Sequence, residues 1–200
     1  MKQLLLDIKP PAPPTLQNFV VGRNAEVLSS LHAAISGDCP SFIYLWGEKG
    51  SGKSHLLSAC KAIGIRVSDN VHLLDNDAQI AFFNEYNQLK ESGSFLITAG
   101  LHAPTQMGLR NDLATRLAWG LVYQLHPLND EEKAQAIKQH AAERGILLPS
   151  EVVDYCLRYL RRDLSTLMAT LDALDEWSLV TKKPVTVPML KKLLQLNLDI

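Results

Sequence analysis

The stretch Gly47-Glu48-Lys49-Gly50-Ser51-Gly52-Lys53-Ser54 decides the fold, because it matches the phosphate-loop pattern G-x-x-x-x-G-K-[S/T] at every fixed position. The apolar run 41–46 precedes it and a helical-looking stretch follows it, which is the strand–loop–helix context that such a loop needs. Glycines let backbone N–H groups curl around an anion, and the following helix adds the positive end of its dipole. The sequence therefore predicts a binding site for a nucleoside di- or triphosphate.

The loop also predicts where Mg²⁺ binds. Lys53 is expected to reach the β- and γ-phosphates, and the Ser54 hydroxyl to ligate the metal. A second carboxylate is expected at the end of a neighbouring strand, where it holds Mg²⁺ through water. Residues 71–74 read as a short apolar strand that ends in Asp75, so we expect Asp75 to be that group.

The residue after this carboxylate bears on hydrolysis. In many ATPases it is acidic and activates the attacking water, whereas here it is Asn76. An amide cannot act as a general base. Asp77 lies one residue further on, in a position that also suits a helix cap. We therefore predict nucleotide binding with slow intrinsic hydrolysis.

Composition narrows the possible classes of protein. The 200 residues are 46% hydrophobic, enough for one substantial core or for a core with a small second lobe. With 20 basic and 21 acidic residues the net charge is −1, which argues against direct sequence-specific DNA binding. The three cysteines are scattered, and no apolar run suits a signal sequence or a membrane span. We expect a cytoplasmic protein with free thiols and no membrane contact.

The hydrophobic pattern predicts an α/β core followed by helices. Up to residue 127 strand-like and helix-like segments alternate, which indicates a parallel sheet between helices. The expected strands are 41–46, 65–67, 71–74, 94–98 and 121–125, and the expected helices are 23–36, one from Lys53, 77–90 and 109–118. Beyond Pro127 four helices are expected, at 130–144, 150–160, 163–178 and 187–196. The expected domains are thus a core at 15–127 and a small all-helical lid at 128–200.

Residues 1–14 are expected to form a tail. Its proline-rich second half cannot continue a helix or join a central strand, so it separates the apolar start from the body. In one interpretation Leu4, Leu6 and Ile8 fill a hydrophobic pocket on a partner, with Gln3 hydrogen-bonded at its edge. In the other, the tail folds back on its own body.

Several segments resemble the AAA+ family, and within it the branch of the bacterial replication initiator DnaA. Residues 18–24, read Asn-Phe-Val-Val-Gly-Arg-Asn, resemble the segment that wraps the adenine in that branch. Residues 52–57 are similar to its phosphate loop and following helix, and 116–121 to its arginine-finger box. Arg162-Asp163-Leu164 is similar to its lid motif. The resemblance covers about residues 15–197 and implies an AAA+ P-loop core with a helical lid.

Two departures from the initiator direct the functional prediction. The chain stops near residue 200, so the initiator's C-terminal helix-turn-helix domain is expected to be absent. Residues 3–8 resemble the Q-L-x-L-x-L peptide that binds the sliding clamp of DNA polymerase III. A short AAA+ body behind such a peptide resembles the Hda group of regulators, which inactivate DnaA.

The resemblance implies roles for individual residues. Arg116 is expected to be an arginine finger that acts on a neighbouring subunit, with a surface ion pair as the alternative. Thr98 is expected near the γ-phosphate as a sensor, or else as an ordinary strand-end threonine. Arg162 is expected to touch the phosphates from the lid, and Arg161 and Arg158 compete for that role. The residues expected to bind nucleotide are Val20, Val21, Gly22, Gly47, Glu48, Lys49, Gly50, Ser51, Gly52, Lys53, Ser54, His55, Thr98 and Arg162.

Three functions remain open from the sequence. In the first, the chain binds ADP or ATP with Mg²⁺, docks on DnaA while tethered to the clamp, and triggers hydrolysis of the ATP on DnaA. A homodimer or a higher oligomer is compatible with this function. The second is a stand-alone AAA+ ATPase or loader that uses its own hydrolysis, and Asn76 argues against it. The third is a small P-loop kinase, which the four helices after the core disfavour.

Overall fold

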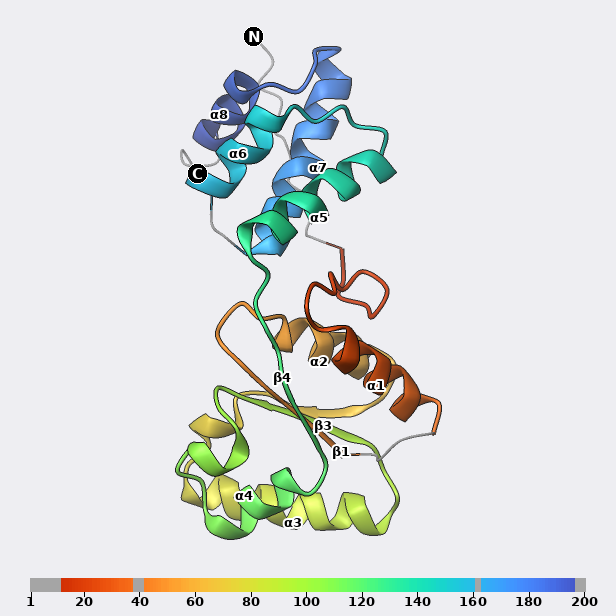
Figure 1. The fold of residues 1–200 in the computed structure, drawn as a ribbon, viewed down its shortest axis with the longest axis vertical. Helices are drawn as coiled ribbons and strands as arrows, with labels where there is room; N and C mark the ends of the chain where they lie inside the picture. Colours follow the sequence, from red (N-terminus) through yellow and green to blue (C-terminus); the bar gives the residue numbers. More distant parts are fainter. Residues whose placement is uncertain (1–11, 38–41, 161–162, 197–200) are drawn as a thin grey trace. The chain divides into compact units, whose positions relative to one another are not determined.

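The computed structural model describes residues 12–37, 42–160 and 163–196 (Figure 1). They form two compact units, one spanning Pro13–Pro127 and the other beginning at Leu128. The first unit contains the sheet, and the second consists of helices. The expected α/β core and the helical region after it are both confirmed.

The first unit is built on a parallel sheet of four described strands in the order β2-β3-β1-β4. These strands are β1 (Phe42–Trp46), β2 (Arg66–Ser68), β3 (Leu96–Gly100) and β4 (Leu121–Gln124). The central strand β1 pairs with β3 on one side and with β4 on the other. All strands run the same way, so their carboxyl ends meet at one edge of the sheet.

Helices cover both faces of this sheet (Figure 1). On one face α1 (Ala25–Ile35) and α2 (Lys53–Ala62) share a core with Ile43 and Leu45 of β1. On the other face α3 (Asn76–Glu91) and α4 (Asn111–Ala118) share a core with Tyr44. Successive strand residues point to opposite faces, which is why neighbours in the apolar run of β1 belong to different cores.

One expected strand is wrong. Residues 71–74 do not join the sheet, because Val71–Leu73 forms one turn of 3₁₀ helix, η1, between β2 and α3. Val71 is buried, whereas the Leu73 side chain is 74% exposed. This short segment with three apolar residues is therefore a turn with one fully buried side chain, that of Val71. Residues 104–106 form a second 3₁₀ turn, η2, ahead of α4.

The second unit contains α5 (Asp130–Glu143), α6 (Ser150–Tyr159), α7 (Leu164–Thr181) and α8 (Val187–Leu196). Asn129 and Glu132 cap the start of α5 reciprocally, and Asp163 accepts a hydrogen bond from the Thr166 N–H at the start of α7. Apolar side chains from all four helices form its core. Asp172 on α7 binds His140 at 2.8 Å and Arg144 at 3.0 Å, which ties α5 to α7.

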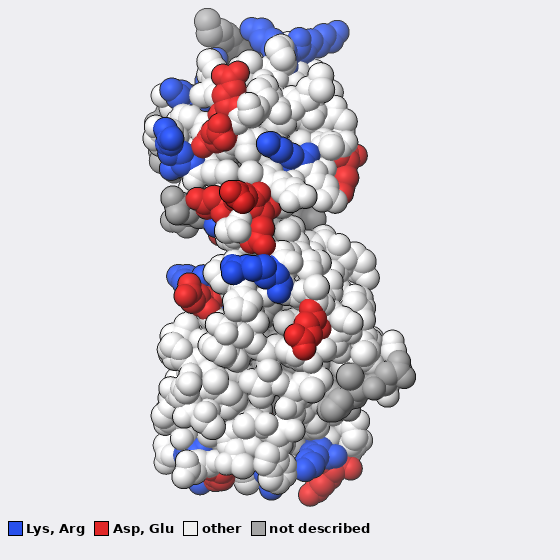
Figure 2. Space-filling view, in the orientation of Figure 1, with Lys and Arg blue, Asp and Glu red and all other residues white. Residues whose placement is uncertain are grey.

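Charged side chains are mixed rather than segregated. On the face drawn in Figure 2, Lys and Arg alternate with Asp and Glu over the second, helical unit. Large areas of the first unit, which contains the sheet, carry neither. The first turn of α5 is acidic, with Asp130, Glu131 and Glu132. Among the described residues, no helix combines the length and apolar character that crossing a bilayer requires.

Candidate functional site

The loop between β1 and α2 has a backbone path that needs glycine. Gly47, Gly50 and Gly52 have φ angles of 152°, 84° and 97°. A Cβ on Gly47 would collide with the backbone carbonyl of Leu125, and one on Gly52 would lie 2.7 Å from the Phe19 ring. The glycines therefore both shape the turn and allow β4 and the segment before α1 to approach it.

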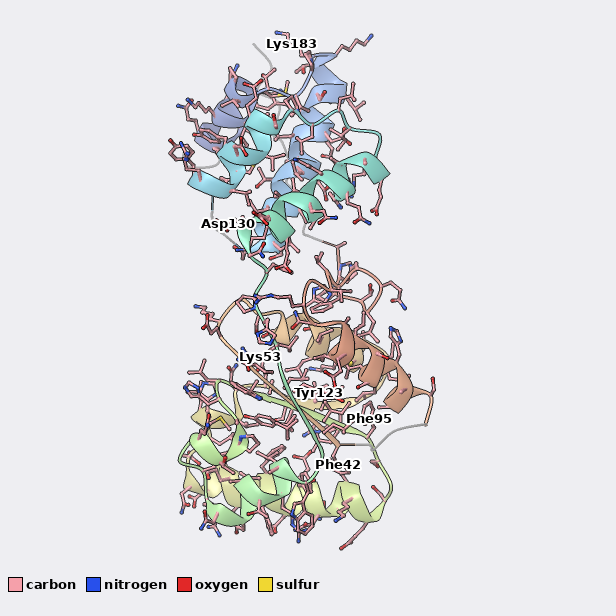
Figure 3. All side chains as sticks on the ribbon, viewed as in Figure 1. Phe42, Lys53, Phe95, Tyr123, Asp130 and Lys183 are labelled. Atoms are coloured by element: carbon pink, nitrogen blue, oxygen red, sulfur yellow. The ribbon has the colours of Figure 1, made fainter. Side chains whose placement is uncertain are left out.

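Lys53 is the first residue of α2 and lies inside the loop (Figure 3). Its ammonium group donates to the carbonyl oxygens of Gly47 at 2.6 Å and Glu48 at 2.9 Å, and lies 3.5 Å from the Ser51 hydroxyl. Burial lowers the pKa of Lys53, and the negative charge of Asp69 opposes that shift. A partly buried cation at a helix N-terminus can bind phosphate oxygens.

Ser54 and Asp69 form a pair of oxygen-bearing side chains that could hold a metal ion. The Ser54 hydroxyl donates to the Asp69 carboxylate at 2.8 Å, and Asp69 directly follows β2. A hydroxyl and a carboxylate side by side suit Mg²⁺, which takes few protein ligands and completes its shell with phosphate oxygens and water. In the described ranges, no group of three or more His, Cys, Asp or Glu forms a metal cluster of its own. The residues present therefore fit a metal that arrives with a nucleotide.

The strand expected to end at Asp75 does not form, and the role of Asp75 as a metal ligand stays a prediction. The Asp75 carboxylate accepts the Ala78 N–H at 2.8 Å and caps α3. The strand that ends near Ser54 is β2, so the acidic residue at its end is Asp69. The sequence offered a signal for it, because Asp69 follows the expected strand 65–67 closely.

The residue after Asp69 bears on hydrolysis as Asn76 does after Asp75. Asn70 follows Asp69, has a φ of 53°, and donates its backbone N–H to the Asp69 carboxylate at 2.7 Å. The residue after the carboxylate is thus again an amide, which cannot act as a general base. Slow intrinsic hydrolysis stays a prediction, because either carboxylate, Asp69 or Asp75, is followed by an asparagine.

The segment before α1 lies against the loop. His55 contacts the Phe19 ring edge-on, with 5.4 Å between the centroids, and its Nε2 lies 2.9 Å from the Thr15 carbonyl oxygen. His55 therefore contacts this segment twice, and its predicted part in nucleotide binding stays a prediction. Val20 and Val21 follow half-buried, and Gly22 follows exposed, with a φ of 49°.

Asn24 is a structural residue that sequence reasoning missed. It is 2% exposed, and its side chain both donates to the His126 carbonyl at 2.9 Å and accepts the His126 N–H at 2.8 Å. Arg23 donates to the Pro127 carbonyl at 3.1 Å. These bonds fasten the segment before α1 to the chain that leaves β4. An isolated asparagine gives no sequence signal for such a bond.

Thr98 does not lie at the end of its strand. The strand β3 runs to Gly100, so Thr98 is its central residue and pairs with Tyr44. The Thr98 side chain is 2% exposed and lines a small hollow with Phe42, Tyr86 and Leu117. Its hydroxyl lies 3.5 Å from the Ile43 carbonyl. The expectation of a strand-end hydroxyl beside the γ-phosphate is therefore wrong.

Arg116 lies at the opposite edge of the sheet from the loop. It occupies the last turn of α4, just before β4, whose first residue Leu121 pairs with Ile43 near the start of β1. Lys53 and Phe42 lie at opposite ends of the sheet in Figure 3. Four residue steps of β1 separate these edges by roughly 13 Å.

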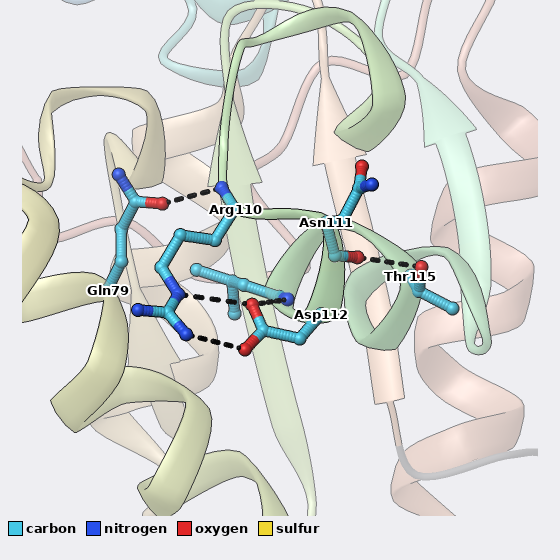
Figure 4. Close-up of polar contacts among 6 residues, drawn as sticks. Gln79, Arg110, Asn111, Asp112 and Thr115 are labelled. Carbon is cyan, nitrogen blue, oxygen red and sulfur yellow. Dashed lines mark hydrogen bonds and ion pairs between the residues drawn. The ribbon is translucent and has the colours of Figure 1, made fainter.

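A polar network fixes the start of the helix that carries Arg116 (Figure 4). The Gln79 side chain on α3 accepts the Arg110 N–H at 2.9 Å. The Arg110 guanidinium binds Asp112 with two hydrogen bonds, and the Asp112 carboxylate also accepts the Leu113 N–H at 2.8 Å. The Asp112 pKa is lowered by its hydrogen bond to Arg110. With Leu113 and Leu117 buried, α4 is a fixed support for its last turn.

A family model and several solved structures are similar to this chain. Residues 130–194 match the family model of the Hda lid domain. Domain III of the replication initiation protein DnaA from Thermotoga maritima superimposes with a TM-score of 0.70 at 21% identity, over 93% of this chain and 98% of that one. The chain therefore has the fold of DnaA domain III, and its helical region matches the Hda lid-domain model.

Two further solved structures have the same fold. AMPPCP-bound DnaA from Aquifex aeolicus matches with a TM-score of 0.66 at 22% identity, over 84% of this chain and 66% of that one. The RuvB Holliday junction branch migration motor of Thermotoga maritima matches with a TM-score of 0.63 at 15% identity, over 92% and 72%. The AAA+ fold with a helical lid is thereby confirmed.

Some predicted site residues lie outside the described part of the chain. They are Gln3, Leu4, Leu6 and Ile8 of the tail, and Arg162 and its competitor Arg161 in the lid. Arg158, the third candidate for the lid sensor, lies exposed in the last turn of α6. The roles proposed for these residues stay predictions.

Proposed function

We propose that this protein is a regulator of replication initiation that stimulates hydrolysis of ATP bound to DnaA. It binds ADP or ATP with Mg²⁺ at its own loop and supplies Arg116 to the nucleotide of a neighbouring DnaA subunit. The observation that carries the proposal is the place of Arg116, at the edge of the sheet opposite its own P-loop. A cation there can serve a nucleotide only across an interface.

The nucleotide part of the proposal depends on the carboxyl edge of the sheet. Lys53, the loop glycines and the Ser54–Asp69 pair provide a cation, backbone donors and metal-binding oxygens. A bound Mg²⁺ would neutralise phosphate charge there. The related DnaA from Aquifex aeolicus is described as bound to AMPPCP, an adenine nucleotide analogue, which supports an adenine nucleotide here.

The arginine-finger part depends on the chemistry of the guanidinium. Among the described residues, no carboxylate forms an ion pair with Arg116, so the surface ion pair weighed as its alternative role has no support. A guanidinium aimed at a transferring phosphate stabilises transition-state charge and is worth about 10³–10⁵ in rate. Arg116 and the phosphate loop lie at opposite edges of the sheet. Subunits would therefore associate head to tail, which permits dimers and larger assemblies.

The tether part depends on the sequence resemblance of Gln3, Leu4, Leu6 and Ile8 to a clamp-binding peptide. Docking on a clamp loaded on DNA would raise the local concentration of the protein around DnaA. The protein then needs no DNA-binding surface of its own, in keeping with its net charge of −1.

The test is the rate of hydrolysis of ATP pre-bound to DnaA, in the presence of clamp loaded on DNA. The wild-type chain should accelerate hydrolysis, and Arg116→Ala should abolish the acceleration at every concentration. Gln3→Ala should lower it at limiting concentration only, because a tether acts through local concentration. Lys61→Ala, an exposed lysine in the last turn of α2, serves as the control. An unchanged rate with the wild-type chain would rule the proposal out.

A second candidate function is a stand-alone ATPase. The Ser54–Asp69 pair favours it, because the metal-binding oxygens stand together beside the loop. Asn70 disfavours it. Rapid turnover of free ATP by the chain alone, without acceleration of hydrolysis on DnaA, would establish this alternative.

A further inference from the structure

Trp119 is an exposed aromatic residue, so burial in a hydrophobic core does not explain why a tryptophan lies there. It follows α4 directly, and 59% of its surface is exposed. Trp177, in the helical unit, is 9% exposed and belongs to a core. An indole left this open to water gains little from the hydrophobic effect, so its contacts must give it another use.

Two cations contact the Trp119 ring. The Arg116 guanidinium carbon lies 4.2 Å from the ring centroid and the Lys90 ammonium nitrogen lies 4.5 Å from it. Arg116 also lies 5.7 Å from the centroid of Phe83 on α3. All these distances are within the range of cation–π attraction. Lys90 and Arg116 are in the last turns of α3 and α4, where the helix dipole also favours positive charge.

An aromatic contact leaves more of the N–H donors of an arginine free than an ion pair does. A guanidinium has five N–H donors in a planar fork, and a bidentate carboxylate occupies two of them. A ring face attracts the cation without accepting those donors in their plane. In the described part of the chain Arg116 has ring contacts and no carboxylate partner, so its fork stays open to a phosphate.

Arg110 shows the contrast within the same helix segment. It lies at the start of α4 and its guanidinium is bound by both oxygens of Asp112 (Figure 4). At the end of the helix Arg116 has the aromatic contacts instead. One arginine is thus occupied in fixing the helix, and the other is held in place with its donors unused.

The other neighbours of Trp119 limit where Arg116 can move. A hollow of about 270 Å³ is lined by Trp119 and Gly120 together with Phe42, Tyr86 and Lys90. Packing alone therefore does not enclose the indole. Displacement of Arg116 toward Lys90 would bring two like charges together, which the repulsion between them opposes. The ring holds the guanidinium, and Lys90 disfavours its collapse into the hollow.

We propose that Trp119 is a positioning residue that presents the Arg116 guanidinium, with its donors free, to the nucleotide of a neighbouring subunit. This inference depends on the proposed function, because it assigns the means by which that arginine is oriented. Trp119 itself does not touch the nucleotide.

The experiment compares Trp119→Leu with Trp119→Phe, which keeps an aromatic face. The control is Tyr159→Leu, which replaces a comparably exposed aromatic residue on α6. Hydrolysis of DnaA-bound ATP is measured against chain concentration with DNA-loaded clamp. Separately, NMR of the free full-length chain follows the Arg116 Nε–H resonance, which a ring current from Trp119 should shift upfield. Thermal denaturation checks that each variant is folded.

We expect Trp119→Leu to lower the maximal stimulated rate about tenfold, with the half-maximal concentration unchanged and the Nε–H resonance moved toward that of a free arginine. Trp119→Phe should recover most of the rate, and Tyr159→Leu should change neither quantity. A wild-type rate for Trp119→Leu, where Arg116→Ala abolishes stimulation, overturns the positioning role and leaves the proposed function standing. So does a lowered rate with an unmoved resonance. Full stimulation by Arg116→Ala overturns the proposed function and the positioning role together.

Discussion

The two edges of the parallel sheet hold their cations in different ways. At the carboxyl edge, the Lys53 ammonium lies within a glycine-shaped loop and donates to backbone carbonyls. At the amino edge, the Arg116 guanidinium lies against the rings of Trp119 and Phe83. Backbone geometry makes the first site, and side chains on the ends of two helices make the second.

This difference teaches what each edge can do. A concave loop with backbone donors and the start of a helix can surround an anion, so the carboxyl edge is suited to receive a phosphate. In the part of the chain that the structure describes, the amino edge has no such loop of backbone donors, but a guanidinium at a helix end can enter a site that another molecule forms. Substitutions at one edge or the other should therefore have different effects.

The largest effect is expected from glycine replacement in the loop. Gly47→Ala should lower the free energy of unfolding of the sheet unit by about 2–4 kcal/mol, because the new Cβ meets the rigid Leu125 carbonyl and φ is 152°. Gly50→Ala is the matched control, with a φ of 84° and no atom within 4 Å of the new Cβ, and should cost about 1 kcal/mol. Urea denaturation measures both. Equal costs would mean that the approach of Leu125, just after β4, does not shape the loop.

The next effect concerns the metal. Asp69→Asn should reduce the gain in ADP affinity that Mg²⁺ provides about tenfold, because a carboxylate next to Ser54 is lost. Asp75→Asn should leave that gain unchanged, since asparagine caps a helix as well as aspartate does. Calorimetric titration of ADP with and without Mg²⁺ distinguishes the two. Loss of the Mg²⁺ effect in Asp75→Asn alone would return the metal site to the sequence prediction.

The sequence predicted the elements better than it predicted their ends. The glycine loop and the eight helices of the described residues follow from a motif and from 3.6-residue periodicity, which depend on many residues at once. Site residues depend on single positions. The strand expected at 94–98 lies at 96–100, and that shift of two residues moves Thr98 from the edge of the sheet into its centre.

A strand was expected at 71–74 for a related reason. The strand β2 has only three residues and one of them is apolar, whereas 71–74 contains three apolar residues. Hydrophobicity therefore favoured the wrong segment. The strand β2 is defined by its backbone pairing with β3. The residue types within a segment do not reveal such pairing. Contacts across long stretches of sequence, such as Asn24 with His126 and Trp119 with Lys90, have no local pattern either.

The smallest effect is expected where the two edges should be independent. Arg116→Ala should leave the affinity of this chain for ADP within about twofold of the wild-type value, since the residue lies at the far edge of the sheet from the loop. Titration of dilute protein with a fluorescent ADP analogue measures it. A large loss at low concentration would mean that the edges are coupled within one chain, and the comparison would fail. A loss that appears only as the protein is concentrated would have a different cause, because Arg116 of one copy would then reach the loop of the next. Head-to-tail contact with DnaA requires that same geometry, so the concentration series also tests whether the amino edge can reach a nucleotide at all.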